Sequence, residues 1–238
     1  MCGRYALHGP ISRHRANRPV DEPPEWYSAL VDTINARPMR FNVAPTDVMP
    51  IVRTSRDGTI AIRESRWGLV PYWAKDIGIG SKAINARAEG IDEKPMFREA
   101  FKRRRCLVPA SGYFEWKPEG AAKQPYFIRG ADRELLMFAG LWESWRETKE
   151  SDPLYTYTIV TGPPGLVSGS IHDRAPVILE EDAWESWLTG EPAAAIDLLK
   201  FAQEPRLTFY PVPKAVGSTK NDAPNLVEPV DLDRSQPS

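Results

Sequence analysis

Cysteine and histidine are scarce in this sequence. Only two cysteines, Cys2 and Cys106, and three histidines occur among its 238 residues. Two cysteines this far apart form neither a disulfide framework nor the ligand spacing of a metal site. We therefore expect no metal and no other cofactor, and a reducing, cytoplasmic compartment in which thiols stay free.

Long apolar runs and a surplus of one charge are also missing. No run of 18 apolar residues occurs, so no transmembrane helix is expected, and the first residues lack the features of a secretory signal. The net charge of −1 alone argues against a nucleic acid partner. However, residues 1–120 carry a net charge of +6 and residues 121–238 carry −7, so the low total hides a basic half. The densest basic stretch is REAFKRRRC, residues 98–106, for which a solvated helix face is the competing explanation.

Proline and glycine, in contrast, are frequent. The 23 prolines and 16 glycines divide the chain into short segments, as in strand-rich folds. The segments with the pattern of strands are 48–53, 105–116, 124–129, 134–145, 154–160 and 206–213. The segments with the pattern of helices are 95–103, with Pro95 in its first turn, 181–188 and 193–202. Because strands and helices do not alternate regularly, we expect one mixed α+β domain over residues 2–229 and a disordered tail over residues 230–238.

Cys2 is the first residue with distinctive chemistry. Removal of Met1 would leave Cys2 with a free α-amine of pKa about 7.7–8.0 beside a thiol of pKa about 8.5. The amine can condense with an aldehyde to an imine, and the thiol on the adjacent carbon can then close a thiazolidine ring. An internal cysteine cannot do this, because its nitrogen is an amide. The competing interpretation is a structural cysteine at this position.

Glu115 and His172 are candidates for proton transfer. His172 lies in GSIHDRAPVIL, between a glycine-rich turn and an apolar run, and histidine carries protons near neutral pH. Glu115 lies in GYFEW, where strand alternation places Tyr113 and Glu115 on one face and Phe114 and Trp116 on the other. Burial there would raise the pKa of the carboxyl and suit it to acid/base work. A histidine satisfied by core hydrogen bonds and a glutamate facing solvent are the competing interpretations.

Polar and aromatic residues that suit a nucleic acid lie in neighbouring segments. In INARAEG, Arg87 can bind a phosphate with two hydrogen bonds and Asn85 can orient a polar ligand. Tryptophans that are exposed beside arginines offer surfaces on which bases stack. Trp67, Trp73 and Trp116 are candidates, and packing in the core is the competing role for each.

Eight segments, taken together and in order, resemble one protein family. They are MCGRYA, FNVAPT, RWGLVPYWAKD, INARAE, RRCLVPASGYFEW, LWESW, IHDRAPVIL, and PVPKAVG with NDAPNLVEP. They resemble successive motifs of the SOS-response-associated peptidase (SRAP) family, the abasic-site-processing proteins, and they span Cys2 to Pro229. The resemblance implies a single mixed α+β domain with a β-barrel-like antiparallel core, flanking helices and a positive groove.

The resemblance also implies a function. Members of the family bind single-stranded DNA that carries an abasic site, and their N-terminal cysteine forms a thiazolidine crosslink with the aldehyde of the open sugar. An abasic-site sensor that protects the site in the DNA damage response, with lyase-like Schiff-base chemistry and an autocatalytic peptidase activity, is therefore expected. The implied catalytic residues are Cys2, Asn85, Glu115 and His172, and the implied DNA contacts are Arg4, Trp73, Arg87, Trp116 and Arg174. The expected partners are single-stranded DNA with abasic sites and replication-fork proteins, and we expect a monomer that is associated with the nucleoid when bound to DNA.

The sequence departs from the family pattern near His172. Ala175 stands where the family usually has methionine, and TGPPGLVSGS, residues 161–170, carries Pro163 and Pro164 where an asparagine-containing turn is usual. Both departures are expected to shift the loop that carries His172. Two other functions stay open: a peptidase or amidohydrolase with Cys2 as N-terminal nucleophile, and a passive single-strand binder in which Cys2 has no role.

Overall fold

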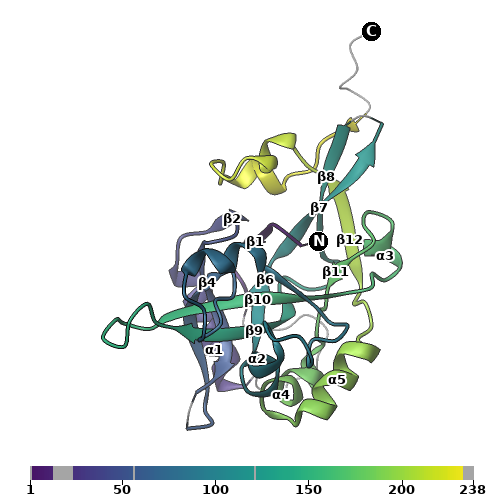
Figure 1. The fold of residues 1–238 in the computed structure, drawn as a ribbon. Helices are drawn as coiled ribbons and strands as arrows, with labels where there is room; N and C mark the ends of the chain where they lie inside the picture. The colour runs from purple at the N-terminus through teal and green to yellow at the C-terminus, as the bar shows by residue number, and fades with distance from the viewer. Residues whose placement is uncertain (1, 13–23, 56, 121, 233–238) are drawn as a thin grey trace.

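The structure is a computed structural model that describes residues 2–12, 24–55, 57–120 and 122–232. Its strands form two sheets (Figure 1). The first sheet has the order β12-β8-β7-β1-β2. Its strands are β1 (Tyr5–Leu7), β2 (Arg40–Val43), β7 (Gly112–Glu119), β8 (Ala122–Gly130) and β12 (Leu207–Pro211).

The second sheet closes on itself. Its order is β11-β10-β4-β3-β6-β9, and the additional pairing of β9 with β10 closes a barrel of five strands. The short β5 runs parallel to β10 outside this path. The strands are β3 (Val48–Thr54), β4 (Ile60–Trp67), β5 (Asn85–Arg87), β6 (Arg105–Ala110), β9 (Leu136–Trp145), β10 (Leu154–Gly162) and β11 (Ala175–Pro176).

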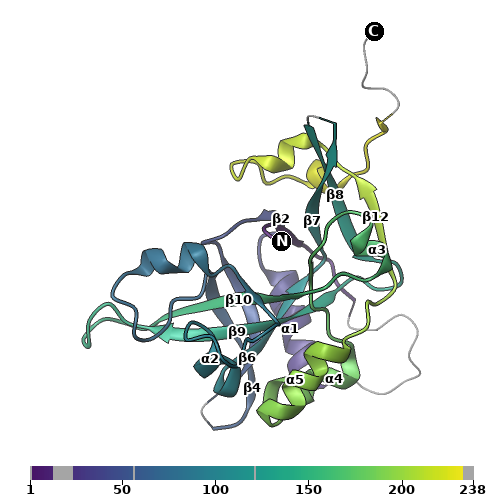
Figure 2. The ribbon, with the colours of Figure 1, turned by 45° about the vertical axis from the view of Figure 1, so that its right-hand side comes forward.

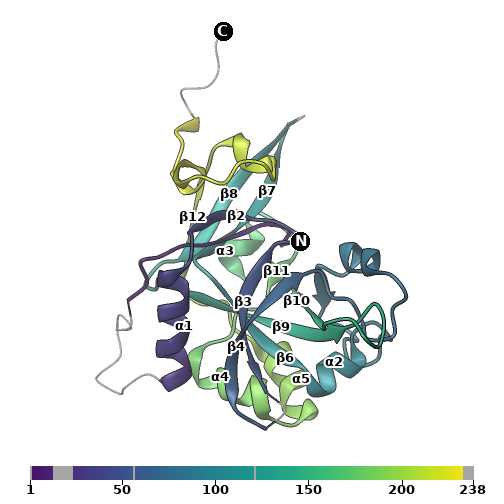
Figure 3. The same ribbon diagram turned by 90° about the vertical axis from the view of Figure 1, so that its left-hand side faces the viewer.

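Helices cover the outside of the barrel. In α1 (Glu25–Ala36), Tyr27, Leu30, Val31 and Ile34 recur at helical spacing and form a buried stripe, which packs on β3 and β4 (Figure 3). The helix α4 (Glu181–Thr189) contacts β3, β6 and α5. The remaining helical elements are α2 (Arg98–Arg103), α3 (Leu166–Gly169), α5 (Pro192–Phe201), η1 (Ile77–Lys82), η2 (Lys214–Gly217) and η3 (Pro224–Val227).

The segment 105–116, expected as one strand, is divided between the two sheets. It forms β6 in the barrel and β7 in the first sheet, with a break at Ser111. Ser111 is held at the break because its amide donates to the Ala6 carbonyl (2.8 Å) and its hydroxyl to the His8 carbonyl (3.1 Å). The next residue must be glycine, because a Cβ on Gly112 would lie 2.4 Å from the Phe127 ring. The break directs β7 away from the barrel and alongside β1.

The structure confirms the α+β class, the single domain and the barrel. It contains strands within the other five predicted strand segments, and helices within all three predicted helical segments. The place given to Pro95 is wrong: α2 begins only at Arg98, because Phe97 and Arg98 both donate their amides to the Lys94 carbonyl and form a turn first. Residues 233–238 of the expected disordered tail lie outside the described residues.

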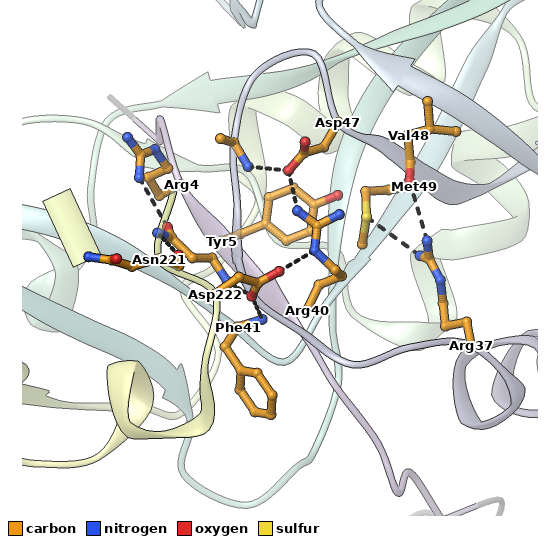
Figure 4. A network of polar contacts seen from close by, with 12 residues as sticks. Arg4, Tyr5, Arg37, Arg40, Phe41, Asp47, Val48, Met49, Asn221 and Asp222 are labelled. Atoms are coloured by element: carbon orange, nitrogen blue, oxygen red, sulfur yellow. Dashed lines mark hydrogen bonds and ion pairs between the residues drawn. The ribbon is translucent and has the colours of Figure 1, made fainter. Parts of the chain in front are cut away.

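The C-terminal segment folds back onto the start of the chain. Figure 2 shows η2 and η3 beside β2, and a polar network joins them (Figure 4). The carboxylate of Asp222 accepts from the backbone amides of Phe41 (2.6 Å) and Asn42 (3.0 Å) and from the Arg40 guanidinium (2.5 Å). Arg40 also donates to Asp47 (2.6 Å). This network attaches the C-terminal segment to β2, the strand that pairs with β1 directly after Cys2.

Buried phenols and thiols give the fold a weakness at high pH. Tyr5 and Tyr157 share a 2.7 Å hydrogen bond between their hydroxyls, and burial raises the pKa of both and of Cys106 above the ordinary values. Above about pH 9 the unfolded chain releases these protons while the folded chain retains them, so stability is complete below the unfolded pKa values and is lost as pH rises.

We expect the melting temperature to fall by at least about 5 °C between pH 8 and pH 10.5, since each such group contributes up to about 1.4 kcal/mol per pH unit. Thermal unfolding across this pH range measures the effect. Cys106→Ala removes one titrating group and should flatten the decline. A melting temperature that stays constant to pH 10.5 would contradict the prediction.

Candidate functional site

Cys2 lies inside the protein, directly before β1. Its side chain is fully buried, and the thiol is 3.9 Å from the Arg4 carbonyl, within reach of a weak S–H hydrogen bond. The Cys2 carbonyl accepts a 2.8 Å hydrogen bond from the side-chain amide of Asn85. The nucleophile predicted from the sequence is therefore held in one position by a residue 83 places further along the chain.

Asn85 reaches Cys2 because β5 pairs with β10. The parallel register places Asn85 beside Ile159 and Arg87 beside Thr161. Within the described part of the chain, no group donates a hydrogen bond to Oδ1 of Asn85, although this atom is buried. A buried acceptor of this kind favours a ligand with a hydroxyl or amine that can donate to it.

Glu115 comes to the site on β7. Tyr5 and Tyr113 are paired across β1 and β7, so the strand that follows Cys2 lies next to the strand that carries Glu115. The alternation predicted for GYFEW is confirmed: Phe114 and Trp116 pack with the small apolar cluster on the far face, while Tyr113 belongs to the main core.

The carboxyl of Glu115 influences the Cys2 thiol. Glu115 is only 3% exposed. Burial, and after it the negative charge of Glu115, raise the pKa of the Cys2 thiol well above the ordinary value. Cys2 is therefore a neutral thiol near pH 7, and Glu115 lies close enough for its charge to act on that thiol.

His172 follows α3 and has two partners on one nitrogen. Its Nδ1 lies 3.1 Å from the backbone amide of Arg174 and 2.7 Å from a carboxylate oxygen of Asp173. Neutral Nδ1 can accept from the amide, and protonated Nδ1 can donate to the carboxylate. The surroundings thus accommodate both protonation states of His172, as an acid/base role requires.

Glu204 holds the loop that carries His172. Its carboxylate accepts from the backbone amides of Val167 (2.8 Å) and Ser168 (2.9 Å) and from the Ser168 hydroxyl. The Ser168 carbonyl in turn accepts from the His172 amide (3.0 Å). Gly165 allows this approach, because a Cβ there would lie 2.5 Å from Glu204. The turn with two prolines is thus fixed from outside by a distant carboxylate.

The three predicted DNA-binding arginines differ in their surroundings. Arg4 donates to Asn42 Oδ1 (3.1 Å) and to two backbone carbonyls of η2, so most of its guanidinium is already used inside the protein (Figure 4). Arg174 forms a two-pronged ion pair with Glu89 (2.5 and 2.9 Å) and lowers the pKa of that carboxyl to about 2. Arg87, in contrast, is exposed at the end of β5.

The tryptophans also differ. Trp73 is 48% exposed, beside Tyr72, which is 61% exposed. Trp116 is half-buried against Phe114 and its neighbours. Trp67 is fully buried and donates to the Ile84 carbonyl (2.8 Å), so packing is its role.

Two residues of this site, Tyr113 and Glu204, were not among the candidates predicted from the sequence. Tyr113 shares the face of Glu115, and the charges of Cys2 and Glu115 are among the causes, after burial, that raise the pKa of its phenol. The alternation of GYFEW could have identified Tyr113. Nothing in the sequence pointed to Glu204, because its effect on the loop depends on a contact across 36 residues.

The described residues offer neither a cluster of metal ligands nor a membrane-spanning helix. In residues 2–12, 24–55, 57–120 and 122–232, no group of three or more histidine, cysteine, aspartate or glutamate side chains is placed to hold a metal ion. None of the helices in those ranges is both long and apolar enough to span a bilayer.

The fold and the site together define a single-domain α+β protein with a buried N-terminal cysteine beside an asparagine and a glutamate. The family model of the SOS response associated peptidase (SRAP) matches residues 1–219. The chain belongs to this family.

Individual relatives agree with the family. The chain is 40% identical over 235 residues to the abasic site processing protein YoqW of Bacillus subtilis, covering 96% of this chain and 99% of that one. It is 30% identical over 269 residues to the abasic site processing protein HMCES of Gallus gallus, covering 98% and 79%. A crystal structure of a protein from Bacteroides thetaiotaomicron superimposes with a TM-score of 0.71 at 28% identity, covering 87% and 91%.

Proposed function

We propose that this protein processes abasic sites in DNA, and that it does so by covalent capture of the abasic sugar in single-stranded DNA. The observation that carries the proposal is the position of Cys2, which is fully buried, accepts a hydrogen bond from the Asn85 amide at its carbonyl, and lies within range of the charge of Glu115. The names of the relatives support the coarser statement, abasic-site processing.

The proposed reaction begins after removal of Met1. The α-amine of Cys2 adds to the sugar aldehyde at C1′, and loss of water gives an imine. The Cys2 thiol then adds to the imine carbon, its proton passes to the nitrogen, and a thiazolidine ring results. The sum is aldehyde plus aminothiol giving thiazolidine plus water. The ring protects the site, because an open imine would promote β-elimination and strand cleavage.

We assign a task in this reaction to each of the predicted catalytic side chains. Glu115 takes the proton that the α-ammonium must lose and assists the thiol in closing the ring. His172 transfers the proton that opens the closed sugar to its aldehyde. Asn85 Oδ1, a buried acceptor, accepts from a sugar hydroxyl and orients the lesion.

The DNA strand is held by other groups. Arg87 supplies charge for a backbone phosphate, and Trp73 and Trp116 supply surfaces for the flanking bases. Arg4 and Arg174 enter the proposal as residues that hold the walls of the site, since their guanidinium groups already donate within the protein.

A cysteine peptidase is the second candidate, and the burial of the Cys2 thiol disfavours it. Such enzymes act through a thiolate whose pKa is lowered by neighbouring positive charge. Here burial and Glu115 raise the pKa of the thiol instead. Condensation through the amine starts without a thiolate.

The proposed function is tested by incubating the protein with single-stranded DNA that carries one abasic site. Intact-mass analysis after denaturation should give protein without Met1, plus DNA, minus one water. An intact oligonucleotide should give no adduct. Absence of the adduct with abasic DNA overturns covalent capture.

Glu115→Gln should slow capture by about 100-fold without abolishing it, because general acid/base groups contribute roughly 10²–10⁴-fold. Quenched time courses of adduct formation measure the rate. The matched control is Glu119→Gln, an exposed glutamate on the same strand, which should leave the rate within about twofold. Equal rates for wild type and Glu115→Gln would remove Glu115 from the mechanism.

A further inference from the structure

A pocket of about 280 Å³ opens where β3, α2 and β9 end. We refer to it as the arginine–aromatic pocket. Its lining includes Thr54, Tyr72, Arg103, Arg104, Trp142 and Ser144. They combine guanidinium groups, hydroxyls and aromatic rings, which are the groups that proteins use to bind nucleotides.

The basic stretch noted in the sequence supplies the charge of this pocket. Arg105 is buried and donates to the carbonyls of Phe101 (2.8 Å) and Trp187 (2.5 Å), so it is structural. Arg103 is exposed in the pocket wall. A solvated helix face therefore explains only part of the run.

Arg104 is both paired and incompletely satisfied. Its Nη2 donates to the buried carboxylate of Glu143 at 2.7 Å. Its Nε is buried, and no acceptor for it exists among the residues that the structure describes. Because Glu143 balances the charge of Arg104, Arg103 contributes the excess positive charge of the pocket. A buried, unsatisfied N–H beside an excess positive charge points to an anionic ligand.

The aromatic wall is held in place from behind. The guanidinium of Arg53 lies 4.4 Å from the centre of the Trp142 ring, and Tyr155 packs against the same ring at 6.1 Å. Tyr72, which projects into solvent, is the second ring of the wall. A fixed indole and an exposed phenol can receive a base by stacking.

The pocket is continuous with the surface that the proposed function assigns to DNA. Tyr72 and Trp73 occupy the two central positions of a turn that closes with a 2.9 Å bond from the Ala74 amide to the Pro71 carbonyl. Trp145, on β9, donates to the Ala74 carbonyl at 2.7 Å and fixes this turn to the strand that carries Trp142. A DNA strand that contacts Trp73 can therefore extend to Tyr72 and to the arginine–aromatic pocket.

We propose that the arginine–aromatic pocket binds one nucleotide of the captured strand, beyond the nucleotide that meets Trp73. Its phosphate lies against Arg103 and Nε of Arg104, with the hydroxyls of Thr54 and Ser144 in reach, and its base lies against Tyr72. This inference rests on the proposed DNA-binding function and extends the bound length of strand. The pocket reads no base identity, because its charge and hydroxyls meet the phosphate and only a ring face meets the base.

The test compares oligothymidylates of about 4 and about 12 nucleotides by fluorescence anisotropy at several salt concentrations. For the long oligonucleotide, Arg103→Ala should weaken binding by about 3- to 10-fold and reduce the salt slope by about 0.7, the value for one phosphate contact on a single strand. For the short one, binding should be unchanged. Tyr72→Ala should weaken the long oligonucleotide without changing the salt slope.

The matched control is Lys102→Ala, an exposed positive charge one residue from Arg103 that does not line the pocket. It should leave both affinities within about twofold. Equal losses in Lys102→Ala and Arg103→Ala, or an Arg103→Ala loss that is independent of length, would show general surface charge and overturn the pocket. Displacement of the long oligonucleotide by micromolar thymidine monophosphate would overturn the DNA assignment in favour of a free nucleotide.

Failure of this inference differs from failure of the proposed function. Capture of a short abasic oligonucleotide is measured in parallel, and Arg103→Ala should capture it at the wild-type rate. If wild type captures the abasic site but the length dependence is absent, only the pocket is wrong. If wild type forms no adduct while the length dependence is present, covalent capture is wrong and the pocket stands.

Discussion

Cys2→Ala abolishes the covalent adduct with abasic single-stranded DNA, while noncovalent binding persists; this is the largest effect that we expect. The reason is chemical: the imine forms on the α-amine, but only the thiol can close the ring that survives denaturation. The variant still has an α-amine at residue 2, and the alanine side chain is small enough to fit in the buried site. Intact-mass analysis after denaturation measures the loss, and anisotropy measures the remaining affinity.

The matched control is Cys106→Ala, which removes the other buried cysteine. It should form the adduct at a rate within about threefold of wild type, because Cys106 lies on β6 in the buried core of the barrel. A denaturation-stable adduct in Cys2→Ala at the wild-type level would contradict the thiazolidine.

An uncleaved N-terminal extension gives a second control on the same reaction. It keeps the thiol but converts the nitrogen of Cys2 into an amide, which cannot form an imine. Adduct formation should therefore fall to the level of Cys2→Ala. An adduct of normal yield in the extended protein would favour attack by the thiol alone, as in the peptidase alternative.

Asn42→Ala is expected to have the largest effect on stability, a loss of about 3–5 kcal/mol in the free energy of unfolding. Asn42 is 1% exposed, and its amide donates to the carbonyls of Val216 (3.2 Å), Ser218 (3.0 Å) and Asn221 (2.8 Å). Its Oδ1 accepts from Arg4 at 3.1 Å. Alanine removes all of these bonds at once, at about 1–3 kcal/mol for each group that is left unsatisfied. Arg4 keeps its bonds to the carbonyls of Val216 (2.9 Å) and Gly217 (3.2 Å).

The loss should be visible in two measurements. Urea unfolding should show a lower midpoint, and limited proteolysis should show new cleavage within residues 214–228, which lose their hydrogen bonds to the Asn42 side chain but keep those of Asp222 to β2. Because Arg4 follows Cys2 closely, capture should also slow in this variant. The C-terminal segment thus contributes to the position of the nucleophile.

Asn221→Ala is the matched control for this prediction. Asn221 belongs to the same segment, is exposed, and donates one side-chain hydrogen bond, to the Ala215 carbonyl (2.8 Å). We expect a loss of at most about 1 kcal/mol. Equal losses in the two variants would show that the segment is held by its backbone rather than by Asn42.

The division between local and tertiary information is clearest at GYFEW. Period-two alternation predicted which residues share a face, and Phe114 and Trp116 do lie together against the small cluster. It did not predict that the segment leaves the barrel at Ser111, because the break is fixed by hydrogen bonds to Ala6 and His8 about 100 residues away. The local sequence pattern determines which residues share a face of a strand, whereas hydrogen bonds to residues far away in the chain determine where the strand bends.

The arginines show the same division. Residue type alone made Arg4, Arg87 and Arg174 equal candidates for DNA, since each guanidinium suits a phosphate. The structure separates them: Arg4 and Arg174 have partners within the protein, and Arg87 is exposed. Whether the charge of an arginine is available to a ligand depends on its neighbours in the fold, which the spacing of residues in the sequence does not reveal.

What the sequence by itself determined is the chemistry and the family: an amine and a thiol on adjacent carbons once Met1 is removed, and an ordered set of motifs that belongs to one family. Only the tertiary structure decided how these groups meet. Pairing of β1 with β7 and of β5 with β10 brings Cys2, Glu115 and Asn85 together, and Glu204 fixes the loop of His172. The reason is that reactivity belongs to individual side chains, whereas proximity depends on strand pairing and hydrogen bonds between residues far apart in the chain.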